Sequence, residues 1–147
     1  MKFTQEGLNK LQGEKEALLL ERVSVLEDVK KSREMGDLSE NGYYKASKSR
    51  LRFIDSQVMR LDRIIKESSI IEKPTGDTIG LGSKVTLRIK GKQITYLLVD
   101  GLEAQPSAGN ISYKSPLGKS LLGKKTGDTV IIQAPNGEST YIVEKLN

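Results

Sequence analysis

Asp37 and Glu40, two acidic residues three positions apart, are the side chains of this sequence best suited to chemistry. They lie within residues 35–45, MGDLSENGYYK, between two long segments of periodic apolar and charged residues. Residues three apart at the start of a helix point to the same side, so both carboxylates can be directed at one ion. Magnesium takes one or two protein carboxylates and completes its shell with water and phosphate oxygens. The pair therefore predicts half of a magnesium site.

The same spacing has a purely structural interpretation. An acid at the start of a helix accepts a hydrogen bond from a free backbone N–H, and a second acid three residues later reaches back to form a capping box. Acidic side chains also suit the positive end of the helix dipole. This role accounts for both carboxylates without an ion, and the sequence leaves the two interpretations open.

Composition limits the other kinds of site. The 147 residues fit one or two small domains, and the net charge of +5 is compatible with a polyanionic partner. The sequence has no cysteine and no histidine, which excludes disulfides, thiolate metal sites and the usual proton shuttle near neutral pH. There is no signal-peptide core and no apolar run of the ~20 residues that span a membrane. We expect a soluble cytoplasmic protein with no membrane partner.

Two long helices are needed to position the acidic pair. Apolar residues at spacings of three and four predict a helix over about residues 4–33, with Leu19 and Leu26 widening its apolar stripe. Gly36 ends it, and a second helix with a heptad pattern follows over about residues 41–68. The short connection makes the helices antiparallel. The first half is therefore a coiled-coil hairpin with the acids at its tip.

The second half has the pattern of a small sheet domain. Glycine and proline over residues 70–83 indicate a linker, and two strand hairpins follow, over residues 84–99 and 129–146. Between them a short helix is expected, with Ser115 as N-cap, Pro116 at its first position and Gly123 as its stop. We predict an α+β protein: a hairpin over residues 1–73, a linker over 74–82, and a domain over 83–147 with an antiparallel sheet and one short helix.

The tip sequence REMGDLSENGYYKA resembles that of the bacterial transcript cleavage factors of the Gre family, whose motif runs G-D-L-x-E-N-a-x-Y. The stretch SPLGKSLLGKKTGDTVIIQAPNGESTYIVEKL is similar to the family's C-terminal pattern, S-P followed by G-L-(l/i)-G-K-x-x-G-D-x-V and a closing strand hairpin. The resemblance covers essentially the whole chain in order. The simple tip and short N-terminus are closer to the GreA branch than to the more basic GreB branch.

The resemblance implies a function. Gre factors insert their coiled coil into the secondary channel of backtracked bacterial RNA polymerase, and a C-terminal domain of FKBP-like fold docks at the channel rim. Their tip carboxylates help to hold the second Mg2+ and position a water, so that the active site of the polymerase cuts the extruded RNA. By this resemblance Asp37 and Glu40 are the catalytic and metal-binding acids. The chain is then no enzyme by itself: it binds no Mg2+ stably when free, and acts as a monomer with polymerase and the 3′ end of nascent RNA.

Other residues receive supporting roles. Gly36, Asn41 and Tyr44 are expected to shape the tip, although Asn41 also fits a plain cap and Tyr44 fits core packing on its heptad. Ser115 and Pro116 are candidate contacts with the polymerase rim. A set of basic residues near the tip is expected either to contact RNA and the channel walls or to form a solvated face: Lys30, Lys31, Arg33, Lys45, Lys48, Arg50 and Arg52.

Two positions depart from the family pattern. Gly42 stands where a small helix former is usual, and Tyr43 stands where many relatives carry another acid. Glycine weakens a helix start by at most ~1 kcal/mol relative to alanine. Both acids of the pair are kept, so we expect cleavage activity with altered efficiency.

Three alternatives remain. A Gre-like paralogue could occupy the same channel and inhibit polymerase, although retention of both acids argues against it. An FKBP-like domain could be a prolyl isomerase, but those pockets are lined by aromatic residues, and the C-terminal half has only Tyr96, Tyr113 and Tyr141. A plain coiled-coil adaptor would tolerate loss of both tip acids, whereas a cleavage factor would not.

Overall fold

The computed structural model describes residues 1–37 and 41–147. The chain divides into two compact units. One is helical and spans Glu6–Ser68; the other combines Met1–Gln5 with Ser69–Asn147 and contains the sheet. The limits of the sequence-based domains, at residues 73 and 83, stay a prediction. Among the described residues, no helix combines the length and apolar character needed to cross a membrane.

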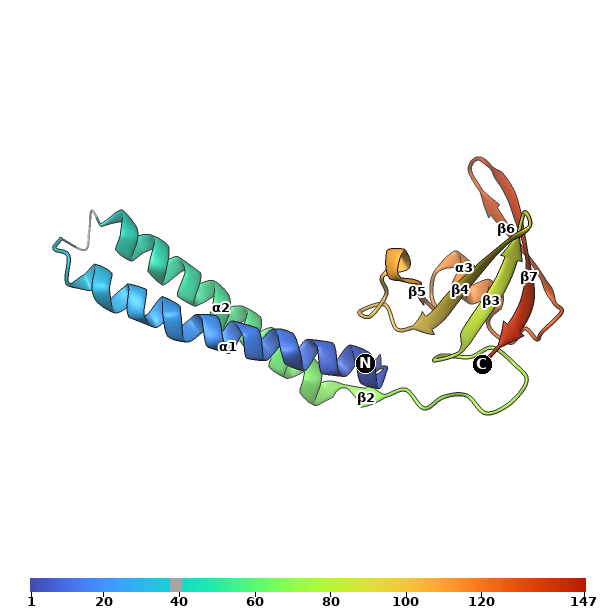
Figure 1. The fold of residues 1–147 in the computed structure, drawn as a ribbon, viewed down its shortest axis with the longest axis horizontal. Helices are drawn as coiled ribbons and strands as arrows, with labels where there is room; N and C mark the ends of the chain where they lie inside the picture. The colour runs from blue at the N-terminus through green and yellow to red at the C-terminus, as the bar shows by residue number, and fades with distance from the viewer. Residues whose placement is uncertain (38–40) are drawn as a thin grey trace. The chain divides into compact units, whose positions relative to one another are not determined.

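The helical unit is the expected hairpin. α1 spans Gln5–Arg33 and α2 spans Gly42–Glu67, side by side in Figure 1. The buried residues of the two helices form the seam between them: Val25, Val29 and Ser32 of α1, and Ser47, Ile54, Leu61 and Ile64 of α2. With only two helices, each helix buries a single narrow stripe, so Leu19 and Leu26 stay about 40% exposed (42% and 41%). Leu19 and Leu26 therefore lie outside the buried seam.

Three ion pairs between described residues join the two helices. Lys15 Nζ lies 2.5 Å from Asp62 Oδ1, and Arg22 Nε lies 2.6 Å from Asp55 Oδ1. A third pair, between Arg50 and Glu21, has an N–O distance of 2.5 Å. All six side chains are partly exposed, so each pair contributes at most about 1 kcal/mol.

The main sheet of the sheet unit has five strands in the order β5-β4-β3-β7-β6. β3 (Lys84–Ile89) pairs antiparallel with β4 (Lys92–Val99) across the two-residue turn Lys90–Gly91, where both residues have positive φ. β6 (Thr129–Ala134) pairs antiparallel with β7 (Gly137–Leu146) across Pro135–Asn136, and β7 also pairs with β3. The expected antiparallel hairpins are thus confirmed.

One strand departs from the antiparallel pattern. β5 (Asn110–Ser112) pairs parallel with the end of β4, so the sheet is mixed. It follows a short 3-10 helix, η1 (Pro106–Ala108), and was not predicted because three residues carry no recognisable alternation. The alternating residues of the strands supply the core with Ile79 and Leu121: Val85, Leu87, Leu98, Ile111, Val130 and Val143.

The short helix α3 (Pro116–Leu121) forms where the sequence predicts it. The Ser115 Oγ accepts a hydrogen bond from the backbone N–H of Gly118 (3.0 Å), and Pro116 begins the helix. Gly118 is buried against β5, and a Cβ there would lie 2.1 Å from the carbonyl oxygen of Ser112. The close approach of α3 to the strand therefore requires glycine.

The ends of the linker region are tied to structure. β1 (Lys2–Phe3) pairs parallel with β2 (Ser69–Ile70), which the sequence did not predict because each strand has two residues. The backbone of Ile79 exchanges hydrogen bonds with the loop after α3, donating to Lys124 and accepting from Gly123. Ile79, in the segment assigned to the linker by composition, is therefore bonded to the loop after α3.

Candidate functional site

The tip begins where α1 ends at Arg33. The N–H groups of Glu34 and Met35 still bond to carbonyls three residues back, and Gly36 then takes a φ of 119°, which favours glycine. Gly36 therefore stops the helix as expected and turns the chain into Asp37, whose side chain is exposed. The second predicted acid, Glu40, lies outside the described residues.

Asn41 fastens the far side of the tip. Its Oδ1 accepts a hydrogen bond from the N–H of Tyr44 (3.0 Å), which makes it the N-cap of α2. Its Nδ2 donates to the carbonyl oxygen of Ser32 in the last turn of α1 (2.7 Å). One side chain thus starts the second helix and holds it to the end of the first.

The N-cap position of α2 is occupied by Asn41 and not by Asp37, because α2 begins at Gly42. The capping box of Asp37 and Glu40 includes residues outside the described range, so both interpretations of the acidic pair stay predictions. The capping interpretation of Asn41 is correct, and the cross-helix bond to Ser32 adds a function that spacing alone did not indicate.

Tyr44 forms a half-buried aromatic platform beside the tip. Lys48 Nζ lies 5.1 Å from the centre of its ring, and the Arg33 guanidinium carbon lies 6.0 Å away. Hydrogen bonding to Lys48, and then to Arg33, lowers the pKa of the Tyr44 hydroxyl below its ordinary value of 10.0. Tyr44 therefore gathers cations from both helices at the tip, in addition to its partial packing on the heptad stripe.

Tyr43 makes the opposite kind of contact. Its hydroxyl donates a hydrogen bond to Asp28 Oδ1 on α1 (2.9 Å). This hydrogen bond to a carboxylate raises the pKa of Tyr43 above its ordinary value of 10.0, because ionisation would place two negative charges together. The sequence marked Tyr43 as a departure but did not find its partner, since the two residues are 15 positions apart.

The basic residues near the tip fall into two groups. Arg33 and Lys48 lie over Tyr44, and Arg50 is paired with Glu21 and stacked on Phe53. Within residues 1–37 and 41–147, no ion-pair partner is found for the remaining four: Lys30, Lys31, Lys45 and Arg52, all exposed. The predicted basic set is thus partly occupied by contacts within the hairpin, and its contact with RNA or channel walls stays a prediction.

The chemistry of the tip fits a shared magnesium site. Asp37 offers an exposed carboxylate oxygen, the kind of ligand that Mg2+ prefers, beside a glycine that lets a partner approach closely. Within the described part of the chain, no cluster of three or more acidic side chains could hold an ion. A magnesium ion at Asp37 would therefore take further ligands from Glu40, water and another molecule.

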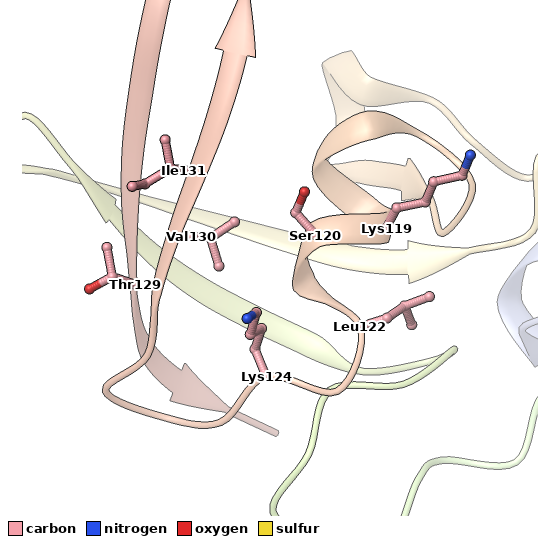
Figure 2. Close-up of a pocket in the computed structure, with 7 residues that line it drawn as sticks. All are labelled: Lys119, Ser120, Leu122, Lys124, Thr129, Val130 and Ile131. Atoms are coloured by element: carbon pink, nitrogen blue, oxygen red, sulfur yellow. The ribbon is translucent and has the colours of Figure 1, made fainter.

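The sheet unit carries a second candidate surface, an open groove between α3 and edge strand β6 with a volume of about 400 Å³. Figure 2 shows α3 and its following loop on one side and β6 on the other. Leu122 and Ile131 are exposed here (38% and 58%), close to Lys119 and Lys124. The sequence analysis did not predict this groove, although apolar residues next to lysines in this stretch could have indicated an exposed binding surface. Of the two residues predicted to contact the polymerase rim, Ser115 caps α3 and Pro116 begins it.

Comparisons with known proteins cover both units. Residues 1–70 match the family described as "Transcription elongation factor, N-terminal", and residues 73–147 match "Transcription elongation factor, GreA/GreB, C-term". The chain is 41% identical to transcription elongation factor GreA of Thermomicrobium roseum over 139 residues, which cover 92% of the chain and 89% of that protein. It is 42% identical to the GreA of Geobacillus kaustophilus over 141 residues, with the same coverage of 92% and 89%. Among solved structures, the GreA factor homolog 1 (Gfh1) of Thermus thermophilus is 26% identical, covering 100% of this chain and 98% of its own, with a TM-score of 0.47.

Proposed function

Because the chain belongs to the GreA/GreB family of transcription elongation factors, we propose that it enters the secondary channel of bacterial RNA polymerase and stimulates cleavage of backtracked RNA. Cleavage would create a new RNA 3′ end at the polymerase active centre and rescue the arrested complex. Its identity of about 40% to proteins named GreA, against 26% to Gfh1, favours an elongation factor of the GreA type.

The observation that carries the proposal is the position of Asp37. It is exposed at the end of a long, thin hairpin, directly after Gly36, where α1 has ended and shortly before α2 begins. At ~1.5 Å rise per residue, the 29 residues of α1 give a rod of roughly 40 Å. A rod of this length can deliver a carboxylate into a deep site of another molecule.

The chemistry is divided between this chain and its partner. Asp37 and Glu40 would supply carboxylate ligands to a Mg2+ ion, and polymerase and RNA phosphates would supply the rest. When bound, that ion activates water for phosphodiester cleavage and stabilises the displacement. Asn41 holds the two helix ends together and so would help to position the segment that carries the acids. The chain by itself is then a cofactor protein and not a nuclease.

The remaining surfaces have supporting roles in this proposal. The four exposed basic residues near the tip can attract the RNA backbone or acidic channel walls, because their charge is not consumed within the described part of the hairpin: Lys30, Lys31, Lys45 and Arg52. The sheet unit would dock on the outside of the polymerase through the surface around α3. We place the functional complex, with one copy of the chain, in the cytoplasm with polymerase.

The test uses a stalled, backtracked elongation complex of bacterial RNA polymerase with 5′-labelled RNA, Mg2+ and no nucleotides. The wild-type chain should shorten the RNA rapidly, and Asp37→Asn should slow cleavage by at least ~100-fold, since loss of a transition-state ligand commonly costs several kcal/mol. Glu34→Gln is the matched control, because Glu34 is an exposed acid at the end of α1 outside the acidic pair. It should cleave like wild type.

Binding must be measured beside cleavage. Asp37→Asn should compete for the secondary channel as well as wild type does. Equal loss of binding and cleavage would make the tip a docking element and contradict the catalytic role. No cleavage by wild type, together with slower elongation when nucleotides are restored, would identify a channel inhibitor. RNA cleavage by the isolated chain in Mg2+ would show that it is an enzyme in its own right.

A further inference from the structure

α1 carries a second heptad stripe that α2 does not cover. Its members alternate spacings of three and four residues, and we call them the outer seam: Glu16, Leu19, Val23, Leu26 and Lys30. Leu20 lies beside them and is 75% exposed, and Val23 at the centre is 63% exposed. Such alternation is the pattern by which helices pair in coiled coils.

The outer seam faces away from the partner helix of the hairpin. One helix turns by about 100° per residue, so a stripe through Val23 lies on the side opposite Val25, which is buried against α2. Figure 1 shows α2 running alongside α1, and within the described part of the hairpin α2 is the one helix that packs on α1. Contiguous apolar side chains on an otherwise charged rod mark an interaction surface.

The charges at the ends of the seam select the partner. Glu16 and Lys30 are each seven residues from Val23, one on each side. If two copies of the chain pair antiparallel about Val23, Glu16 of each copy lies opposite Lys30 of the other, and the apolar residues meet between them. A parallel pairing would instead oppose Glu16 to Glu16 and Lys30 to Lys30. The seam is therefore complementary to itself under a two-fold axis.

We propose that the outer seam binds the outer seam of a second copy of the chain, as a weak antiparallel dimer. The contact covers about two heptads, well below the ~800 Å² that each partner buries in a standard interface, so association should depend on concentration. The paired rods would be too thick at mid-length for a channel that accepts one. In that respect the inference rests on the proposed function: the dimer would be a reserve form, and the monomer the active one.

The experiment measures the mass of the full chain in solution by sedimentation equilibrium, without polymerase. The wild-type mass should rise above 16.2 kDa toward twice that value as concentration increases. Val23→Glu should weaken association by at least ~10-fold, since pairing would bury an unmatched charge. Met59→Glu is the matched control: Met59 is 68% exposed on α2, off the seam, and its substitution should leave association unchanged.

Charge exchange tests the antiparallel arrangement. Glu16→Lys and Lys30→Glu should each weaken self-association, because each opposes like charges at both ends. An equal mixture of the two variants should associate again, as should the chain carrying both changes, because opposite charges then face each other. These effects should shrink at high salt.

Three results would overturn the proposal. One is a mass that stays at 16.2 kDa up to a protein concentration of ~1 mM, at which even weak specific association is detectable. Another is association that Val23→Glu leaves unchanged. The third is a wild-type monomer whose Val23→Glu variant binds polymerase less tightly, which would assign the seam to the polymerase. Because the mass is measured on the chain alone, these results do not depend on whether it stimulates RNA cleavage.

Discussion

Replacement of Asn41 should loosen the tip without touching either acid. In Asn41→Ala the cap on the Tyr44 N–H and the bond to the Ser32 carbonyl are both lost. A lost N-cap costs about 1 kcal/mol, and a lost neutral hydrogen bond costs about 1 kcal/mol more. The free energy of opening the first turn of α2 should therefore fall by about 2 kcal/mol.

Amide hydrogen exchange under native conditions measures this opening directly. The Tyr44 amide should exchange about 30-fold faster in Asn41→Ala than in wild type, since 1.4 kcal/mol corresponds to a factor of ten. Asn41→Ser is the matched variant: its hydroxyl keeps the cap but is too short to reach Ser32, so the effect should be about half as large in free energy. The rate of RNA cleavage should fall in the same order, less in Asn41→Ser than in Asn41→Ala.

Exchange at the Tyr44 amide that is alike in Asn41→Ala and Asn41→Ser and close to wild type would contradict this expectation. That result would mean that the bond across the helices is not formed in solution. A second contradictory result would be local loosening as expected with undiminished cleavage. The position of the acids would then be set by polymerase and not by the hairpin.

Three further predictions concern stability and titration. Gly118→Ala should lower the stability of the sheet unit by at least ~2 kcal/mol in calorimetry, because the added Cβ would overlap the Ser112 carbonyl. Gly13→Ala should instead raise the stability of the hairpin by up to ~1 kcal/mol, because an added Cβ at this position of α1 meets no atom within 4 Å beyond its neighbours in the helix backbone. Arg88, on the neighbouring strand, is the main cause that holds the pKa of Glu144 below its ordinary 4.5. The contribution of Glu144 to the free energy of unfolding is therefore present above pH 4.5 and is lost as the pH falls through the lower pKa of the folded state. In unfolding curves recorded over a pH series, Glu144→Gln should reduce this loss of stability in acid. Ultraviolet titration should show a tyrosine that ionises below pH 10, and Tyr44→Phe should remove it; a titration unchanged by Tyr44→Phe would contradict the effect of the two cations.

The outline of the fold was predictable because its signals are local. Gly36 ends α1 at the expected place, and both strand hairpins follow from alternating patterns around short turns. Ser115 caps α3 through its own side chain, which is a contact within three residues. Where a few neighbouring residues decide the structure, one sequence is enough.

The features that were missed depend on distant partners. β5 is a strand only because β4 lies beside it, and three residues leave no periodic trace. The contact between Tyr43 and Asp28 needs the register of the two helices, which propensity does not fix. For the same reason the apolar pattern did not show that Leu19 and Leu26 stay largely exposed, as they do in a unit of two helices.

The site itself was predictable in part. Motif and spacing predict the acidic pair, and the structure shows that Asn41 is the N-cap of α2. The other acid, Glu40, lies outside the described residues, so the joint metal-binding geometry stays a prediction. In the proposed function the ligand set would be completed by polymerase and RNA, which one sequence cannot specify.

The position of the tip depends finally on charges far from it. Lys15 faces Asp62 and Arg22 faces Asp55, seven residues apart on each helix, so the pairs repeat with the heptad. A slip of one heptad that set Arg22 near Lys48 would bring Lys15 beside Asp55, so one of the two ion pairs would be replaced by a contact between like charges. Such exposed pairs add little stability, but they disfavour the wrong register, and the register sets how many residues the tip must span. The ion pairs along the rod therefore help to determine where Asp37 is held.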